Sequence, residues 1–393
     1  MSALLKSIKL KDYRSYQLCR VDFDRATVLV GPNGAGKSNL IDALHFLSDA
    51  VNLGLDAALT QRGGITAVRR RVPRGRPPDV EIEINVQLSK YEARYSVTIG
   101  SSRGGDWRLK SERFEALTSE ALSPALIRYE RVPGSVEMLG FGEQFPTDQR
   151  SSIVEAFSGS GALLLSVFSA QEPIGELYAF LQGMSFYSIF PDTLREPQRP
   201  LSSYPLDEYG GNLNSVIRTM SDRKRSELDR IRSALTDMVP GVKNFKIKQA
   251  GGYLTASVSS ELSEGDAWFD ASQCSDGTLR ILGILVALHQ HPTRSFVAIE
   301  EPELTVHPGV LPALADEIME ASQRSQVLVS THSPDLVARL PIENLRVVEG
   351  SASGSRIGPV SDEQRQAVND LLFSSGDLLR LGMRQEGSAP VGL

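Results

Sequence analysis

The stretch Ala26-Thr-Val-Leu-Val-Gly-Pro-Asn-Gly-Ala-Gly-Lys-Ser38 decides the fold of this chain. Within it, Gly31-Pro-Asn-Gly-Ala-Gly-Lys37-Ser38 satisfies the pattern G-x-x-x-x-G-K-[ST] of a phosphate-binding loop. A β-prone run, Ala26–Val30, precedes the glycines, and apolar residues recur at helical spacing after Ser38. A strand, a glycine-rich loop and a helix in this order predict the opening unit of an α/β nucleotide-binding fold.

The chemistry of this loop suits phosphate. Its glycines allow positive φ, so consecutive backbone N–H groups can curl around the β-phosphate of a nucleotide. Lys37 can reach the β- and γ-phosphates, Ser38 can bind Mg²⁺, and the N-terminus of the following helix adds a favourable dipole. The alternative is a surface glycine turn before a helix, and the flanking strand and helix argue against it.

Composition excludes several classes of protein. The chain has 393 residues, of which 41% are hydrophobic and 23% are charged, and its net charge is −6. These values argue against a disordered chain and against a globally cationic nucleic-acid binder. Its two cysteines, Cys19 and Cys274, cannot form a disulfide framework or a four-ligand zinc site. No apolar run approaches the roughly 18 residues of a membrane span, and no secretory signal is present, so we expect a cytoplasmic protein without a membrane partner.

The α/β pattern is interrupted by a long stretch of different character. Residues 79–99 alternate apolar and polar side chains, which predicts antiparallel strands. The α/β pattern returns from Cys274 onward, with apolar strands predicted at residues 296–299, 326–329 and 345–348. We therefore expect a split core formed by residues 1–52 and 271–393, and an inserted β-meander and helical subdomain over residues 53–270. Within the insertion we expect a helical stretch over 153–184, an irregular segment over 185–211, a helix over 222–238 and a hairpin over 245–259.

Two acidic residues, Glu300 and Glu301, follow the apolar strand predicted at Phe296–Ile299. A buried strand of a parallel sheet delivers such carboxylates to the carboxyl edge of the sheet, beside the phosphate loop. We expect Glu300 to hold Mg²⁺ through its water shell and Glu301 to orient or deprotonate the attacking water. Two acids after a strand are usually a solvated turn, but the phosphate loop favours the catalytic interpretation.

Two further motifs stand near predicted strand and helix ends. Ser330-Thr331-His332 follows a predicted strand, and a histidine there can donate to the γ-phosphate or polarise the lytic water. Ser275-Asp-Gly-Thr278 opens a predicted helix, for which Ser275 is a good N-cap. The alternatives are a structural histidine and a capped helix without further function.

In this order, the phosphate loop, Ser275–Thr278, Glu300-Glu301-Pro302-Glu303 and Ser330–His332 resemble the motifs of ABC/SMC-like ATPases. Tyr13-Arg14-Ser15 stands where such heads carry an aromatic, a basic and a small residue. The chain is similar in particular to small AAA-type ATPases without coiled coils, which are related to the head domain of overcoming-lysogenisation-defect proteins. The resemblance covers the two ends of the chain, and the middle matches only loosely.

The resemblance implies an α/β fold, a P-loop ABC/SMC-type ATPase head with a large inserted α+β region. It implies ATP and Mg²⁺ as cofactors, and a head-to-tail homodimer that holds ATP between the phosphate loop of one subunit and the signature of the other. The implied nucleotide-binding residues are Gly31, Asn33, Gly34, Ala35, Gly36, Lys37, Ser38, Asn39, Arg14, Ser275 and Gly277. The implied catalytic residues are Glu301, His332 and Lys37, and the implied metal ligands are Ser38, Glu300 and Gln171. Many relatives have Asp in place of Glu300, and Gln171 is marked as a glutamine-loop residue only by the Glu172-Pro173 that follows it.

A basic segment follows the first predicted helix. Residues 67–78 read as an exposed loop rich in arginine and proline. Its arginines could contact DNA phosphates or reach the γ-phosphate as an arginine finger does, or they could form a solvated loop that balances nearby acids. The basic side chains are Arg62, Arg69, Arg70, Arg71, Arg74 and Arg76, of which the last five are the candidate DNA contacts.

These features favour an ATP-hydrolysing switch that acts on DNA or on a separate effector protein, in DNA repair or anti-phage defence. One alternative is the nucleotide-binding subunit of an ABC transporter. It is disfavoured because residues 38–275, which separate the phosphate loop from the signature, are far more than a transporter head needs, and because the signature lacks the double glycine expected there. A TOPRIM nuclease is disfavoured because no Asp-x-Asp follows Val348-Glu349-Gly350. A non-hydrolysing structural module requires that Glu301 be dispensable. The aromatic stretch Phe186–Tyr209 either offers a docking surface for the effector or packs onto the β-meander.

Overall fold

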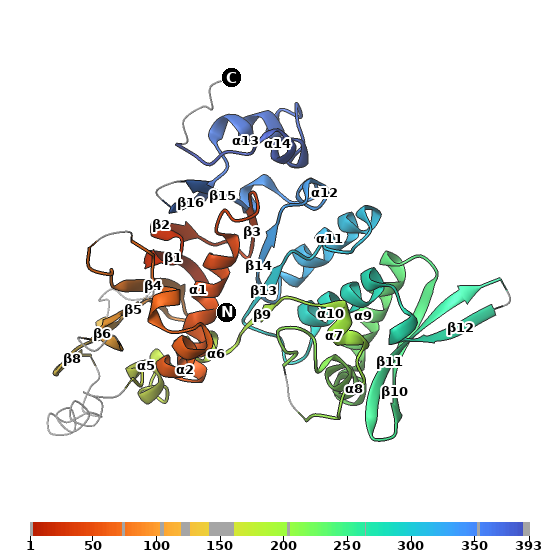
Figure 1. The fold of residues 1–393 in the computed structure, drawn as a ribbon, viewed down its shortest axis with the longest axis horizontal. Helices are drawn as coiled ribbons and strands as arrows, with labels where there is room; N and C mark the ends of the chain where they lie inside the picture. The colour runs from red at the N-terminus through yellow and green to blue at the C-terminus, as the bar shows by residue number, and fades with distance from the viewer. Residues whose placement is uncertain are drawn as a thin grey trace. The chain divides into compact units, whose positions relative to one another are not determined.

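The computed structural model shows two compact units, each built from several segments of the chain (Figure 1). The first comprises Met1–Asp24, Pro32–Met184 and Val348–Gly358. The second comprises Arg25–Gly31, Ser185–Val347 and Pro359–Leu393. The structure describes residues 3–72, 75–102, 106–118, 126–140, 161–202, 205–263, 265–351 and 354–387.

An antiparallel sheet of seven strands forms the frame of the first unit, in the order β2-β1-β4-β5-β6-β7-β8. Buried and half-buried residues alternate along β4, so one row of apolar side chains faces the core. The predicted antiparallel strands are therefore present, and the two N-terminal strands belong to the same sheet. Its strands are β1 (Leu4–Tyr13), β2 (Tyr16–Asp22), β4 (Val80–Gln87), β5 (Tyr91–Ser101), β6 (Trp107–Thr118), β7 (Leu126–Val132) and β8 (Ser135–Leu139).

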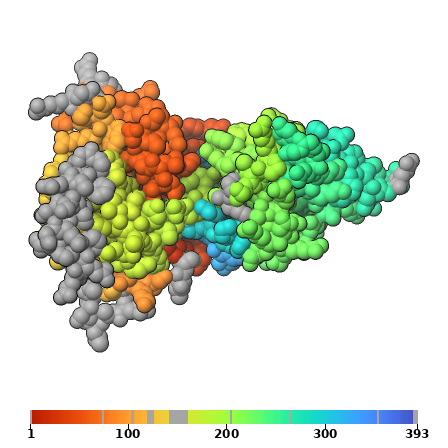
Figure 2. All heavy atoms as spheres, turned by 90° about the horizontal axis from the view of Figure 1, so that it is seen from below, coloured from red at the N-terminus to blue at the C-terminus, as the bar shows by residue number. Residues whose placement is uncertain are grey.

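Short helices pack around α1 in the same unit. Helix α6 packs against α1, and α5 packs against α6; Figure 2 shows the yellow-green segment that contains α5 and α6 against orange residues of the N-terminal part. The Ser48 hydroxyl of α1 donates to the Leu181 carbonyl at 3.0 Å. The fully buried Glu112 fixes the start of α5, because its carboxylate accepts from the amides of Leu164 at 2.8 Å and Leu165 at 2.9 Å. The helices are α1 (Lys37–Asn52), α2 (Leu55–Gln61), α3 (Ile65–Val68), α5 (Leu164–Val167) and α6 (Ile174–Gln182).

A six-stranded sheet has the order β16-β15-β3-β14-β13-β9. Its strands β3, β14 and β13 lie wholly in the second unit, run parallel and are buried almost throughout, as a parallel sheet requires. The apolar strands predicted near residues 296, 326 and 345 are thus confirmed. The strands are β3 (Ala26–Val30), β9 (Met184–Tyr187), β13 (Phe296–Glu300), β14 (Gln326–Thr331), β15 (Leu345–Ser351) and β16 (Gly354–Pro359).

The core of the second unit is built around α10, whose residues from Thr278 to His289 are all buried. A separate three-stranded sheet consists of β10 (Val242–Ala250), β11 (Tyr253–Leu262) and β12 (Gly265–Asp270), and its first turn lies at Gly251-Gly252 as predicted. The helices are α7 (Pro191–Arg195), α8 (Leu213–Arg223), α9 (Arg225–Met238), α10 (Asp276–His289), α11 (Leu311–Ala321), α12 (Pro334–Val337), α13 (Asp362–Asn369) and α14 (Ser375–Leu381). None of the helices in the described residues is long and apolar enough to cross a membrane.

The boundaries of the two compact units differ from those expected for the split core and the insertion. Strands β4–β8 join β1 and β2 in one sheet, whereas the chain from Ser185 to Asp270 packs into the unit that contains α10. Within residues 53–270 the chain therefore passes from the first unit to the second after Met184, and it does not change unit at residue 270. Residues 222–238, which were expected to form one helix, are divided between α8 and α9 at Lys224.

The stretch from Phe186 to Tyr209 is more ordered than expected. It contains the end of β9 and the helix α7, and its side chains Ile189, Leu194 and Leu206 are buried in the core of the second unit. Phe190 and Tyr209 stay exposed, and their rings lie 5.7 Å apart. The buried apolar side chains of this stretch thus serve the core of its own unit. Of the predicted helical stretch over 153–184, residues 153–160 lie outside the described part.

Candidate active site

The phosphate loop leads into α1 in the first unit. Gly36 is the N-cap of α1 and has a φ of 118°, a conformation that favours glycine. A Cβ atom there would clash with the Ser355 side chain and would lie 3.0 Å from the Ser15 hydroxyl. Lys37 is only 6% exposed, and its ammonium group donates to the Pro32 carbonyl at 3.3 Å. The lysine is therefore folded back along the loop that is expected to bind phosphate.

The triplet Tyr13-Arg14-Ser15 braces this loop. The side-chain amide of Asn39 donates to the Ser15 hydroxyl at 2.7 Å, and the Tyr16 hydroxyl donates to the Gly36 carbonyl at 3.0 Å. Arg14 forms an ion pair with Asp42 of α1 at 2.8 Å. The first unit thus brings together Arg14, Asn39 and the loop from Pro32 to Ser38, which the sequence predicted as parts of one nucleotide site.

The arginines that follow α1 do not all lie in one exposed loop. Arg62 forms ion pairs with Asp42 and Asp49, both at 2.8 Å. Arg69 is 9% exposed and donates to the Ser101 hydroxyl at 2.8 Å. The expectation of a solvated loop is therefore wrong for these two residues, because each arginine side chain is largely buried and has a hydrogen-bonded partner.

The remaining arginines of this segment differ in exposure. The Arg70 guanidinium lies 2.7 Å from the Asp12 carboxylate, whereas Arg71 and Arg76 are exposed. Arg74 lies outside the described residues. A cavity of about 710 Å³ in the first unit has a basic wall that suits an anionic group, and its lining includes Arg14, Ser15, Gly34, Arg69, Arg70, Arg71 and Ser355.

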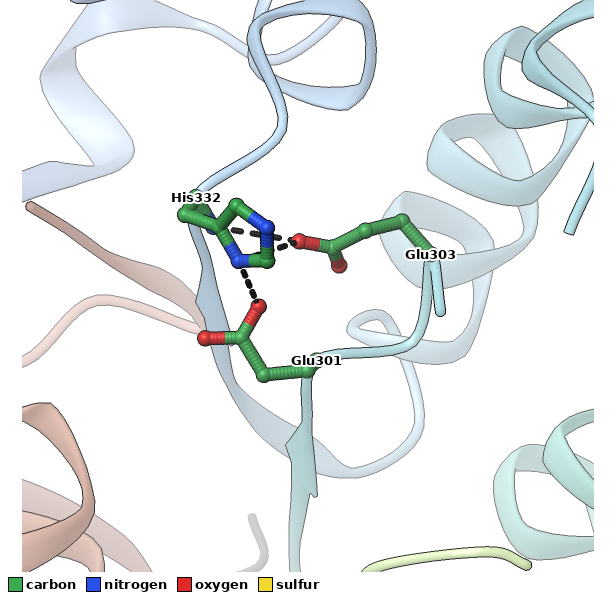
Figure 3. Close-up of side chains that lie close together, drawn as sticks. All are labelled: Glu301, Glu303 and His332. Carbon is green, nitrogen blue, oxygen red and sulfur yellow. Dashed lines mark hydrogen bonds and ion pairs between the residues drawn. The ribbon is translucent and has the colours of Figure 1, made fainter. Parts of the chain in front are cut away.

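Three side chains of the second unit converge where two parallel strands end (Figure 3). Glu301 follows β13, and its carboxylate is hydrogen bonded to Nδ1 of His332, which follows β14. The Glu303 carboxylate accepts from the Thr331 hydroxyl at 2.6 Å and from the His332 amide at 3.1 Å. Glu301 and His332, which the sequence singled out separately, are thus brought together, with Glu303 as a third member.

The register of the parallel strands places this cluster at one edge of the sheet. Glu300 pairs with Ser330, and Thr331 pairs with Val30 at the end of β3. Gly31, the first glycine of the phosphate loop, follows Val30 directly. The carboxyl ends of β13, β14 and β3 therefore lie side by side, as ligand sites in open α/β sheets require.

Glu303 had no assigned role in the sequence interpretation. It is only 9% exposed, and one oxygen of its carboxylate has no hydrogen-bond partner. Burial, and then the neighbouring Glu301 carboxyl, raise the pKa of Glu303. The spacing Glu-Pro-Glu after a strand is the signal that could have identified it.

The backbone of Glu301 is held in an uncommon conformation. Its φ is 44°, in the left-handed region, which for a residue other than glycine marks local strain. Its amide donates to the Ser330 carbonyl at 2.9 Å, and its carbonyl accepts from the Arg280 guanidinium at 2.9 Å. Arg280 was also missed, although a lone arginine inside the apolar run of the signature helix could have drawn attention to it.

The signature motif forms the N-terminus of α10 as predicted. The Ser275 hydroxyl caps the helix by accepting from the Thr278 amide at 3.2 Å, and Ser275 itself is exposed. The Arg195 guanidinium donates to the Cys274 carbonyl at 3.2 Å and forms an ion pair with Asp276. Gly277 lies against another turn, because a Cβ atom there would be 2.9 Å from the Thr305 carbonyl.

The candidate metal ligands lie on different elements. Glu300 ends β13, and Ser38 lies in the first turn of α1. Both offer the hard oxygen donors that Mg²⁺ prefers. Gln171 lies in the turn between α5 and α6, where its backbone amide donates to the Phe168 carbonyl at 2.9 Å. Its role as a glutamine-loop ligand stays a prediction.

Comparison with known proteins agrees with this geometry. A family model described as "AAA domain, putative AbiEii toxin, Type IV TA system" matches residues 26–338. The DNA replication and repair protein RecF from Oenococcus oeni is 49% identical over 47 residues, which are 12% of this chain and 13% of that protein. RecF from Caulobacter vibrioides is 35% identical over 122 residues, which are 30% of this chain and 28% of that protein. The chain thus spans less than a third of the length of these relatives.

Solved structures show the same fold at low sequence identity. An Smc head bound to the C-terminal winged-helix domain of ScpA is 15% identical with a TM-score of 0.52, and the match covers 92% of this chain and 99% of that one. An Smc head from Pyrococcus furiosus with an extended coiled coil, bound to the C-terminal domain of ScpA, is 14% identical with a TM-score of 0.50. That match covers 94% of this chain and 99% of that one. The fold is therefore the α/β P-loop ATPase fold of SMC heads, as predicted.

Proposed function

Because the chain belongs to this AAA domain family of the AbiEii type, and is an ATPase of the SMC/RecF/AAA class, we propose that it hydrolyses ATP and works as a dimerising switch. The observation that carries the proposal is the contact between Glu301 and His332 at the carboxyl ends of β13 and β14. A carboxylate paired with a histidine at such an edge suits the activation of a water molecule. The strand β3, which leads into the phosphate loop, is the parallel neighbour of β14.

The proposed site divides the work among a few groups. Backbone amides of the phosphate loop and the Lys37 ammonium bind the phosphates of ATP, and Arg14 adds positive charge to the same unit. Ser38 and Glu300 would hold Mg²⁺, which would supply positive charge against the phosphates. Glu301 accepts a proton from the attacking water, and His332 orients the Glu301 carboxylate through their hydrogen bond.

We propose a homodimer in which Ser275 and Gly277 meet the nucleotide bound to the partner. The exposed Ser275 hydroxyl lies at the N-terminus of α10, a helix of 14 residues whose dipole favours negative charge in front of it. Arg195 braces this end through Cys274 and Asp276. An exposed helix terminus that is rigidly held suits a phosphate group that arrives from another subunit.

Replacement of Ser275 by arginine is expected to abolish the ATP-dependent dimer, because bulk and positive charge would occupy the place of the incoming γ-phosphate. Light scattering with ATP and Mg²⁺, in a Glu301→Gln background that retains ATP, measures the mass of the particle. Ser374→Arg is the matched control, since Ser374 caps α14 of the same unit but lies outside the signature. A monomer in the Glu301→Gln background alone would contradict the sandwich model.

DNA is a proposed partner of the first unit. The exposed arginines Arg71 and Arg76 support this, as does the likeness to proteins named for DNA replication and repair. Replacing both by serine is expected to weaken DNA binding and to reduce the salt slope by about one for each phosphate that is no longer neutralised. Fluorescence anisotropy with labelled duplex DNA at several salt concentrations measures both quantities.

Arg113→Ser provides the control for this experiment, because Arg113 is an exposed arginine on β6 of the same unit. Weaker binding with an unchanged slope would point to a defect in folding and not to the removal of a phosphate-binding side chain. If the unmodified protein binds no DNA at physiological salt, the DNA partner is abandoned.

A separate effector protein is the other proposed partner, in DNA repair or in anti-phage defence. ATP hydrolysis becomes useful only when two states of the head present different surfaces to another molecule. The turn between α13 and α14 supports such a contact, because Leu371 is 90% exposed and Leu372 is also exposed, as is Leu381 at the end of α14. We place this activity in the cytoplasm.

A further inference from the structure

Arg280 occupies an unusual place for an arginine. It lies on α10, one turn after the signature residues Ser275 and Gly277, and only 4% of its surface is exposed. Its neighbours along the helix, Leu279 and Ile281, are buried apolar side chains. Arginine is almost never buried to this degree unless it has a specific partner.

The partner of Arg280 is the main chain of the proposed catalytic residue. Its Nη2 atom donates to the Glu301 carbonyl at 2.9 Å, and its Nε atom is buried without a hydrogen-bond partner. Burial lowers the pKa of Arg280, and the nearby carboxylates of Glu303 and Glu301 act in the opposite direction. Glu303 and Glu301 thus stabilise the positive charge of the guanidinium, while its hydrogen bond fixes one peptide group.

The peptide group that Arg280 holds is the strained one. With a φ of 44°, Glu301 stays in the left-handed region only if the surrounding structure fixes it. Three hydrogen bonds to its main chain do so. The Glu301 amide donates to the Ser330 carbonyl on β14, and the Glu301 carbonyl accepts from the Leu304 amide at 3.2 Å in the same turn and from Arg280 on α10, which is the one link to the signature helix among the three. Removing the bond from Arg280 would allow the backbone to relax and the Glu301 carboxylate to leave His332.

A second contact joins the same helix to the same turn. Gly277 lies against the Thr305 carbonyl, four residues after Glu301, where even a Cβ atom would be only 2.9 Å away. Thr305 also has a positive φ, of 62°. The turn from Glu301 to Thr305 is therefore held against α10 at Gly277 and at Arg280.

We propose that Arg280 is a positioning residue that ties the signature helix to the catalytic carboxylate of the same subunit. When Ser275 and Gly277 engage the nucleotide of the partner, a small shift of α10 moves the Glu301 carbonyl through Arg280. The catalytic carboxylate of one subunit then reaches its working position only when that subunit has docked. This inference rests on the proposed roles of Glu301 and of the dimer.

The test compares Arg280→Met and Arg280→Lys with Arg294→Met. Arg294 is the matched control, because it is a partly buried arginine of the same unit, burial lowers its pKa, and it donates to the Ser185 hydroxyl at 2.8 Å. For Arg280→Met we expect kcat for ATP hydrolysis to fall on the order of 100-fold, as for a displaced catalytic group, with unchanged nucleotide affinity. Arg280→Lys keeps the charge and one donor, so it should recover part of the rate. An Arg280→Met protein with the parental kcat, or an equal loss in Arg294→Met, would overturn the proposal.

A double variant separates positioning from general damage to the fold. In the Glu301→Gln background, the addition of Arg280→Lys should lower kcat no further, because the group that Arg280 positions is already inactive. A multiplicative loss would show that Arg280 acts elsewhere and would overturn the proposal. Arg280→Lys on its own decides the matter if Arg280→Met does not fold.

These outcomes are distinct from failure of the proposed function. Hydrolysis that is insensitive to Glu301→Gln would remove the assigned base itself. If Glu301→Gln slows hydrolysis while Arg280→Met and Arg280→Lys leave kcat unchanged, the base stands and only the link through Arg280 is refuted.

Discussion

Replacement of Glu301 by glutamine is expected to slow ATP hydrolysis by about 100-fold or more, the usual effect of losing a positioned general base. The substitution keeps the size and shape of the side chain but removes the charge that accepts the proton. Nucleotide binding should persist, because the groups that bind phosphate come from the loop that precedes α1. Phosphate release under single-turnover conditions measures hydrolysis, and a fluorescent ATP analogue measures affinity.

Glu317→Gln is a closely matched control for this prediction. The Glu317 carboxylate contacts His289 Nε2 at 2.6 Å, so it forms another glutamate–histidine pair in the same unit. His289 is buried and lies on α10, away from the strand ends that carry Glu301 and His332. The control variant should hydrolyse ATP at the parental rate. Parental turnover by Glu301→Gln would instead favour a structural module that binds ATP without hydrolysing it.

Local sequence was sufficient to predict the parts of the site that depend on neighbours in the chain. The glycines before Lys37, the acids after Phe296–Ile299 and the cap at Ser275 each have a signature within a few residues. The structure places the acids at the end of β13 and Ser275 at the start of α10. The position of Glu301 and of His332 at strand ends was predicted, whereas the hydrogen bond between them is a finding of the structure.

The rest depends on contacts between distant segments, which a single sequence does not reveal. Strand β1 pairs with β4, as at Ile8 and Ile84, and this pairing places β4–β8 in the same unit as the N-terminal strands. The burial of Arg62 depends on Asp42 and Asp49, which lie on α1. In the sequence, Arg280 is only a polar residue within an apolar helix. Its contact with the Glu301 carbonyl depends on the turn that packs against this helix.

Replacement of Lys37 by alanine is expected to have the largest effect of all, a loss of nucleotide affinity of at least about 100-fold. In the proposed site the buried lysine would supply charge-assisted hydrogen bonds to the phosphates, and each such bond contributes roughly 1.5–3 kcal/mol. Its ammonium group already lies near the loop, 3.3 Å from the Pro32 carbonyl, so little side-chain reorganisation is needed when phosphate binds. Isothermal titration calorimetry with a non-hydrolysable ATP analogue and Mg²⁺ measures the affinity directly.

Lys90→Ala controls for the loss of one positive charge, because Lys90 is exposed in the turn between β4 and β5 of the same unit. It should bind the analogue as the parental protein does. The melting temperature of the Lys37 variant without nucleotide shows whether the loop still folds around Gly36. A folded Lys37→Ala protein that binds ATP at parental affinity would mean that the phosphates are held elsewhere, for which the arginine-lined cavity beside Gly34 is the next candidate. Since Lys37→Ala removes binding while Glu301→Gln spares it, the pair assigns affinity to the phosphate loop and proton transfer to the strand ends.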